Sequence, residues 1–375
     1  MPPGVTPCGV AGNEAFACQG PSIHRYAQCA WECKKPSTAF HRQGSIMRSY
    51  STAACLVLVC ALVVLCSQAL FADEPSNSPR LFAPGVISGA ADDMSPAFTP
   101  DGNTVFFSRG NDSGSVILES HREKGEWSRP VIASFSGTWN DLEPAMAPDG
   151  SFLVFASNRP ADHGTKPIDG NFDGKAFPAL GGNLWRVDRQ GAGWGTPKRL
   201  PDAINADTGT FSPSVAADGS IYFMRPAKSN GRFALYRSQY RDGSYQAATP
   251  MSVGDATTED VDPAIAPDES FIVYSSNHPD RHDHKRLQIA FRQNGNWGIP
   301  IDLGNEVNEE GSNIESRLGS DHSTLYFSTN TVPPASFPRP PGQADRSLAQ
   351  MQVWADGREN IWYVTLKPWL DSHRK

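Results

Sequence analysis

Apolar and polar residues alternate along residues 142–160, which read LEPAMAPDGSFLVFASNRP. Two short apolar runs flank a Pro-Asp-Gly turn, where proline presets the backbone and glycine supplies a positive φ. The stretch therefore predicts a β-hairpin. Four more copies of this pattern occur along the chain, the last with altered turn residues: 94–109, 211–225, 261–277 and 314–330.

Each of the first four hairpins is followed by two more strand signals. After the second hairpin these are residues 183–189 (NLWRVDR) and an aromatic-led segment, residues 194–197 (WGTP). Four short strands per unit, joined by turns, are typical of a β-propeller blade. The fifth unit ends after its third strand, residues 360–366. Residues 78–88 precede the first hairpin at the spacing of a fourth strand, so we expect them to complete the last blade.

These signals predict an all-β fold, a five-bladed propeller closed by an N-terminal strand. Closure of the ring removes the sheet edges that would otherwise be exposed. Six blades remain the alternative if residues 161–182 or 331–359 hide a degenerate unit. Both segments are rich in proline and glycine and lack alternation, so we interpret them as loops.

Residues 47–72 have the three parts of a secretory signal peptide. Met47 and Arg48 supply a start and a positive charge, an uncharged apolar run follows at 53–66, and small residues come next. The run is too short to span a bilayer as a helix, so no membrane span is expected in the mature chain. We predict cleavage after Ala69 or Ala72, which leaves a propeller domain of residues 73–375 that is periplasmic or secreted. Residues 1–46 are interpreted as an extension that is untranslated or disordered.

Composition narrows the class further. The chain has 40 acidic and 33 basic residues, a formal charge of −7, and this balance argues against nucleic acid as a partner. All seven cysteines precede residue 67, so the mature domain would contain none.

The hairpin pattern S/E-P-x-x-x-P-D-G, with its F-x-S-N-R ending and a G-x-W-S-x-P strand, resembles the WD40-like β-propeller repeat of the TolB family and related bacterial envelope proteins. The resemblance covers residues 78–366 and implies a propeller of the cell envelope. The repeat class includes protein-docking scaffolds as well as domains attached to hydrolases. TolB has an additional N-terminal domain that has no counterpart here.

Alignment of the hairpins on their first proline, or on Ser316, reveals a candidate site. Two positions before it every residue is apolar, whereas one and three positions before it every residue is polar. Alternation should place both polar sets on one side of the strand, at the mouth of the central channel. We therefore predict that six carboxylates converge there: Asp93, Asp141, Glu143, Asp260, Asp262 and Glu315.

Arginines join this predicted site. One position after the proline the other blades have alanine or serine, but the fifth has Arg317, which either clamps an anionic ligand or neutralises Glu315 or another carboxylate. The loops of variable length lie on the same side, which we call the top face, and repeat proteins usually bind there. Three further arginines end hairpins on this face and either bind the ligand or form inter-blade ion pairs: Arg109, Arg159 and Arg225.

One loop resembles half of a calcium site. Asp169, Asn171 and Asp173 match D-x-N-x-D-G, whose alternate oxygens suit Ca²⁺. The closing acid of an EF-hand would fall on Leu180, so an EF-hand is excluded. A looser calcium turn and a metal-free Asx-turn loop stay open.

The leading hypothesis is a monomeric, non-catalytic envelope scaffold that binds a protein or an envelope glycan on its top face. The rival is a carbohydrate-binding or carbohydrate-active protein that uses two channel carboxylates. No Gly-x-Ser-x-Gly elbow is present, which argues against a serine hydrolase. This second hypothesis is weakened by the small number of aromatic side chains on which a sugar could stack. We expect only Trp354, Phe172 and Phe177 in top-face loops, and the other tryptophans in the strands of the blades.

Overall fold

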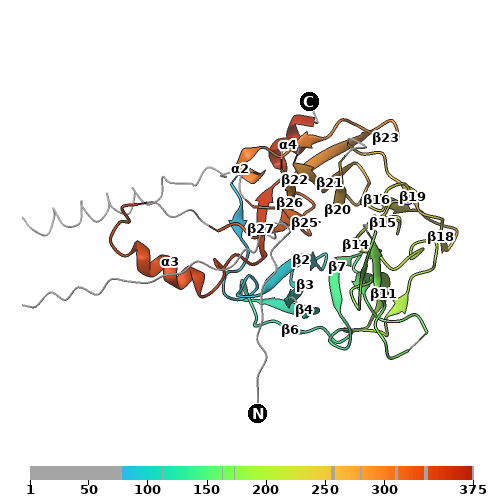
Figure 1. Ribbon diagram of the computed structural model, residues 1–375, viewed down its shortest axis with the longest axis horizontal. Coiled ribbons are helices and arrows are strands. Elements are labelled where there is room, and N and C mark those ends of the chain that lie inside the picture. Colours follow the sequence, from blue (N-terminus) through green and yellow to red (C-terminus); the bar gives the residue numbers. More distant parts are fainter. Residues whose placement is uncertain are drawn as a thin grey trace, which may run out of the picture. The chain divides into compact units, whose positions relative to one another are not determined.

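Five antiparallel sheets of four or five strands surround a common axis in the computed structural model (Figure 1). The structure describes residues 78–373, apart from 112, 163, 173, 255–257, 279–280, 309–310 and 333–336. They belong to one compact unit, Asp73–Lys375. The predicted signal peptide, the extension before it and all seven cysteines lie outside the described residues.

The sheets follow one another along the chain, and each is a blade. Blade 1 contains β2 (Asp92–Phe98), β3 (Thr104–Asn111), β4 (Gly114–Glu123), β5 (Glu126–Trp127) and β6 (Val131–Ile132). Blade 2 contains β7 (Asp141–Met146), β8 (Phe152–Ser157), β11 (Asn183–Gln190), β12 (Gly193–Trp194) and β13 (Lys198–Arg199). Blade 3 contains β14 (Phe211–Val215), β15 (Ile221–Pro226), β16 (Phe233–Ser238) and β19 (Thr249–Pro250), with a small hairpin of β17 (Tyr240–Arg241) and β18 (Ser244–Tyr245).

The last two blades complete the ring. Blade 4 contains β20 (Asp260–Ile265), β21 (Phe271–His278), β22 (Arg281–Gln293), β23 (Asn296–Trp297) and β24 (Ile301–Asp302). Blade 5 contains β25 (Ile314–Leu318), β26 (Thr324–Thr329), β27 (Asn360–Thr365) and the N-terminal β1 (Arg80–Leu81). Two short helices flank blade 5, α2 (Asn305–Asn308) and α4 (Lys367–His373). Within the described residues, no helix is long and apolar enough to cross a membrane.

The N-terminal strand closes the ring as predicted. β1 runs antiparallel to β27, with Arg80 opposite Tyr363 and Leu81 opposite Trp362. Directly after β1, the Phe82 N–H donates to the Ile361 carbonyl at 2.8 Å. The prediction of five blades is confirmed, and the six-bladed alternative is wrong.

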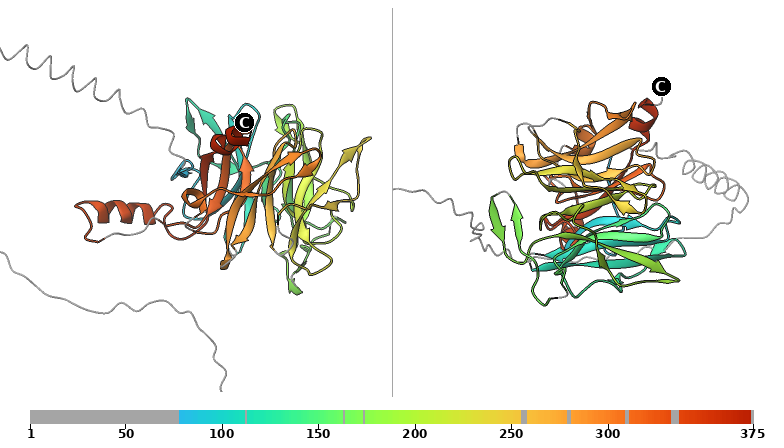
Figure 2. Two further views of the ribbon diagram at one scale, coloured as in Figure 1. Left: turned by 90° about the horizontal axis from the view of Figure 1, so that it is seen from above. Right: turned by 90° about the vertical axis from the view of Figure 1, so that its right-hand side faces the viewer.

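The two segments that we interpreted as loops contain secondary structure of their own. The second blade's loop forms a hairpin of β9 (Gly170–Phe172) and β10 (Lys175–Phe177). The fifth blade's loop contains α3 (Gln343–Met351), which protrudes from the edge of the disc (Figures 1 and 2). Neither segment adds a blade, because neither supplies a strand to one of the five sheets.

Apolar side chains fill the space between neighbouring blades. β8 is buried along its whole length, as its continuous apolar run requires. The Trp194 ring at the edge of blade 2 meets the Phe106 ring of blade 1 edge-to-face at 5.5 Å. This contact is the packing role that we predicted for the tryptophans of the outer strands.

A β-bulge interrupts the first strand of every blade, just before the aligned proline or Ser316. The residue at this point has a left-handed backbone although it is never glycine, at an energetic cost on the order of 1 kcal/mol each. These residues are Ser95 (φ 53°), Glu143 (φ 55°), Ser212 (φ 48°), Asp262 (φ 56°) and Glu315 (φ 56°). Because a bulge adds one residue to the strand, the two polar sets no longer share one side of it.

Candidate functional site

The bulges bring three of the predicted carboxylates to the propeller axis, where each links two blades. The Ser212 N–H donates to Glu143 Oε2 at 2.6 Å, and the Glu315 N–H donates to Asp262 Oδ2 at 3.0 Å. The Ser95 hydroxyl donates to Glu315 Oε2 and so joins blade 5 to blade 1. In each case the acceptor belongs to the preceding blade, so these carboxylates fasten the ring together.

Arg317 lies among these carboxylates and is buried, with 4% of its surface exposed. Its Nη2 lies 3.3 Å from Glu315 Oε2, and both Nη atoms donate across the axis to the Ser212 hydroxyl at 3.3 Å. We call Glu143, Asp262, Glu315 and Arg317 the axial cluster. Of our two readings of Arg317, this geometry supports the neutralisation of Glu315.

Burial shifts the protonation of the axial cluster. Loss of solvent, together with repulsion from Asp262, raises the pKa of Glu143 to about 7. Burial and then repulsion from Glu143 and Asp262 raise the pKa of Glu315 well above its ordinary value. Glu143 therefore exchanges a proton near neutral pH, although the Arg317 guanidinium lies in the same cluster.

The other three predicted carboxylates stay inside their own blades. Asp93 pairs with Arg109 at 2.6 Å, and burial nevertheless raises the pKa of Asp93 to about 6. Asp141 pairs with Arg159 at 2.7 Å. Asp260 accepts hydrogen bonds from the hydroxyls of Ser276 at 2.6 Å and Thr258 at 2.9 Å. The six carboxylates thus form two groups and do not converge on one opening, because the bulge turns the second set away from the first.

The predicted arginines make contacts within the fold. Arg109 also donates to the Ile87 carbonyl at 2.7 Å, so it connects blade 1 to the N-terminal segment. The Arg159 guanidinium lies 5.2 Å from the centre of the Trp185 ring. Arg225 lies 4.2 Å from the centre of the Tyr236 ring and donates to a carbonyl at 3.3 Å. The alternative that we gave to ligand binding was inter-blade ion pairs, whereas the ion pairs of Arg109 and Arg159 each lie within a blade.

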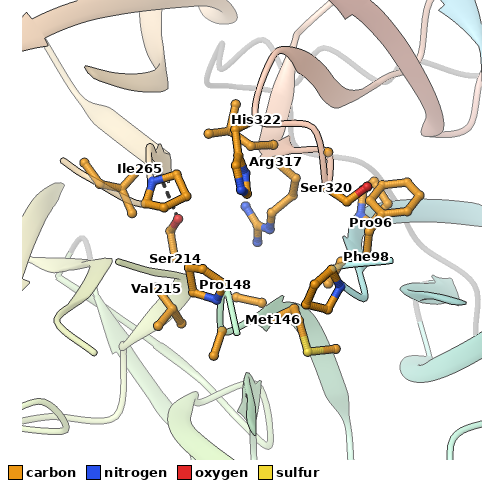
Figure 3. Close-up of a pocket in the computed structure, with 17 residues that line it drawn as sticks. Pro96, Phe98, Met146, Pro148, Ser214, Val215, Ile265, Arg317, Ser320 and His322 are labelled. Carbon is orange, nitrogen blue, oxygen red and sulfur yellow. Dashed lines mark hydrogen bonds between the residues drawn. The ribbon is translucent and has the colours of Figure 1, made fainter. Parts of the chain in front are cut away.

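A small pocket lies next to the axial cluster and includes Arg317 in its lining (Figure 3). Arg317 points into it, and prolines such as Pro96 and Pro148 form part of its wall. It opens at the end of the channel near the Pro-Asp-Gly turns, opposite the top face. Its volume is about 70 Å³, room for about two water molecules, whereas ligand pockets usually exceed about 300 Å³.

Larger cavities lie away from the axis. One of about 620 Å³ lies between blades 1 and 2 at the top face, between the β3–β4 connection and the segment that leads into β7. Another of about 640 Å³ lies beside blade 4, where its Trp297 packs against the core. The first cavity is lined by Trp139, which our sequence reasoning missed. A signal existed, because four other blades have a small or polar residue at the aligned position.

The aromatic residues that we predicted for the top face are already engaged. Trp354 meets Trp362 edge-to-face at 5.8 Å. Phe172 and Phe177 stack on each other across the β9–β10 hairpin, with ring centres 4.2 Å apart. None of these three rings lines the cavity between blades 1 and 2 among its described residues.

In the loop that resembles half of a calcium site, the first acid, Asp169, makes a contact within the fold. Asp169 Oδ1 accepts the Ala179 N–H at 2.7 Å, which holds the base of the β9–β10 hairpin. Asn171 pairs with Ala176 in that hairpin, and Asp173 lies outside the described residues. Among the described residues, no group of three histidine, cysteine or acidic side chains is arranged to hold a metal ion.

Comparison with known proteins concerns the fold alone. No protein-family model and no curated protein sequence matches this chain. Among solved structures, it is similar to TolB from Acinetobacter baumannii (20% identity, 60% of this chain and 46% of that one, TM-score 0.38). It is also similar to an α-L-arabinofuranosidase from Lactobacillus brevis (10% identity over 72% of this chain and 90% of that one, TM-score 0.46). A third similar structure is a gluconolactonase from Xanthomonas campestris (16% identity over 77% of this chain and 84% of that one, TM-score 0.37). The chain thus spans about half the length of the Acinetobacter TolB.

Proposed function

We propose that this chain is a secreted or periplasmic β-propeller that acts without catalysis and docks a protein of the cell envelope on its top face. The observation that carries the proposal is the burial of all six candidate carboxylates in contacts within the fold. A glycoside hydrolase needs an acid and a second carboxylate that reach the substrate from either side of its bond. Here each carboxylate accepts hydrogen bonds from the protein, so we assign these groups to the fold.

The insertions in the top-face loops support docking, although α3 extends from there past the edge of the disc. α3 has no buried residue, and its Leu348 and Met351 are 55% and 48% exposed on neighbouring turns. Phe337 in the same insertion is 76% exposed. The β9–β10 hairpin stands out from the disc as well (Figure 2). Exposed apolar side chains on insertions that other blades lack are typical of protein-binding surfaces.

Location and assembly are parts of the same proposal. The envelope location rests on the predicted signal peptide of residues 47–72 and on the resemblance of the repeat. We propose a monomer, because the outer strand of each blade is only two residues long and leaves little free edge to join two copies.

Photo-crosslinking in whole cells tests the docking face. We expect a crosslinking amino acid at Leu348 to give a discrete protein adduct, and one at Asp101, in an exposed turn of the opposite face, to give none. Because apolar anchors dominate docking, Leu348→Asp should weaken recovery of that protein at least about tenfold. Equal adducts from both positions, or none from Leu348, would contradict the proposal.

A further inference from the structure

Trp139 breaks the repeat at the top face. It lies five positions before the aligned proline of blade 2, at the point where the chain turns into β7. The other blades have small or polar residues at this position: Ala91, Thr208, Thr258 and Gly311. A blade therefore folds without a large ring at this position.

Trp139 is also the exception among the tryptophans. Seven others in the described part of the chain pack into the core or against another ring: Trp127, Trp185, Trp194, Trp297, Trp354, Trp362 and Trp369. Trp139 makes no ring contact and no side-chain hydrogen bond with the described residues, and it is only partly buried. It lines the cavity of about 620 Å³ between blades 1 and 2, a volume within the usual range for ligand pockets.

The residue after it provides an oriented hydrogen-bond donor. Asn140 Oδ1 accepts both the N–H of Ser115 at 2.6 Å and its hydroxyl at 2.8 Å. A backbone N–H can only donate, so the orientation of the amide is settled. The Asn140 Nδ2 group has no partner among the described residues. Asn140 lines the same cavity as Trp139 and therefore brings to it an amide whose orientation is fixed before any ligand arrives.

The rest of the wall is polar and neutral. Hydroxyls and amides line the cavity: Asn111, Ser113, Ser115, Thr138 and Asn158. None of the described lining residues is acidic. The one cation among the described lining residues, Arg109, is neutralised by Asp93 at 2.6 Å. The described part of the wall therefore offers hydrogen bonds and no unpaired charge.

We propose that this cavity binds a neutral saccharide, with a pyranose ring stacked on Trp139 and a hydroxyl accepting from Asn140 Nδ2. A pyranose has an apolar C–H face and a rim of hydroxyls, so it matches an indole surrounded by amides and hydroxyls. This site goes beyond the docking face, because its ligand and its residues differ from those of α3.

Titration calorimetry on the full chain tests the site with cellobiose, maltose and N,N′-diacetylchitobiose, and with anionic digalacturonate. We expect at least one neutral disaccharide to bind more tightly than digalacturonate. Trp139→Ala should weaken that binding at least about tenfold, and Trp139→Phe less, because it keeps a ring. Trp354→Ala is the matched control, since Trp354 lies in a top-face loop but packs on Trp362, and it should bind like the parent.

Three results would overturn the proposal: no binding of any neutral disaccharide, preference for digalacturonate, or unchanged binding by Trp139→Ala. The docking face is tested separately, because Trp139→Ala should leave the Leu348 adduct intact. Loss of that adduct in every variant would contradict docking without touching the saccharide site.

Discussion

Replacement of Phe82 by alanine is expected to lower the free energy of unfolding by about 3–5 kcal/mol. Phe82 is 7% exposed and follows the strand that closes the ring. Its ring meets four others, at centre distances of 5.2 to 6.3 Å: Phe98, Trp127, Tyr326 and Tyr363. Trp127 and Phe98 belong to blade 1 and the two tyrosines to blade 5, so truncation opens a cavity at the junction where the ring closes.

Val86→Ala is the matched control for this substitution. Val86 lies in the same N-terminal segment but is 37% exposed, so its truncation should cost less than about 1 kcal/mol. Urea unfolding of the full chain, followed by tryptophan fluorescence, measures both variants. Equal losses for the two would show that the closing segment contributes little specific packing, and blade 5 would then be held by β25, β26 and β27 alone.

The closure could be predicted because its signals are local. Apolar alternation and turn residues repeat with each blade, so the unpaired segment of residues 78–88 could be assigned by its spacing alone. Packing of Phe82 against blade 5 follows from that assignment. The hairpin and helix inside the two long loops were missed for different reasons. β9 and β10 are only three residues long, and α3, whose sequence QADRSLAQM contains no proline or glycine, shows none of the strand alternation that we looked for.

The bulges explain why only three of the six predicted carboxylates lie at the propeller axis. A residue with a left-handed backbone is usually glycine, so the sequence often indicates such a position. Glu143 and Asp262 adopt this conformation although neither is glycine. Strict alternation therefore placed Asp141 and Glu143 on one face, whereas the bulge sends Glu143 to the axis and leaves Asp141 in its blade. Nothing in the local sequence marks this bulge. It is held by contacts between blades, such as the Glu143 N–H to the Ser108 hydroxyl at 2.7 Å.

Trp139 illustrates the opposite case, a residue that sequence alone could have found. Comparison of the aligned blades five positions before the proline isolates it at once. The orientation of Asn140 could not be found in this way, because it depends on Ser115, which the fold brings from the neighbouring blade. Departures from a repeat thus identify candidate residues, and the packing of blades decides what those residues can bind.

Glu143→Gln is expected to stabilise the propeller above pH 7 and to have little effect near pH 4.5. Burial raises the pKa of Glu143 from an ordinary value near 4.5 to about 7 in the folded state. The folded protein therefore retains a proton that the unfolded chain releases in this range. The stability that this carboxyl contributes is fully present below pH 4.5 and is lost as the pH rises through 7, a change of about 3 kcal/mol.

Glutamine removes this loss without removing the contact, because its side-chain oxygen can still accept the Ser212 N–H. The parent should lose stability between pH 5 and 8, and Asp93 and Glu359 add to that decline, since burial raises their pKa values to about 6 and about 7. The difference between variant and parent isolates Glu143. Urea unfolding at a series of pH values measures it, with the exposed Glu126→Gln as the control that should follow the parent throughout. A difference that does not change with pH would mean that Glu143 is ionised in the folded ring, and that Arg317 alone balances the carboxylates at the axis.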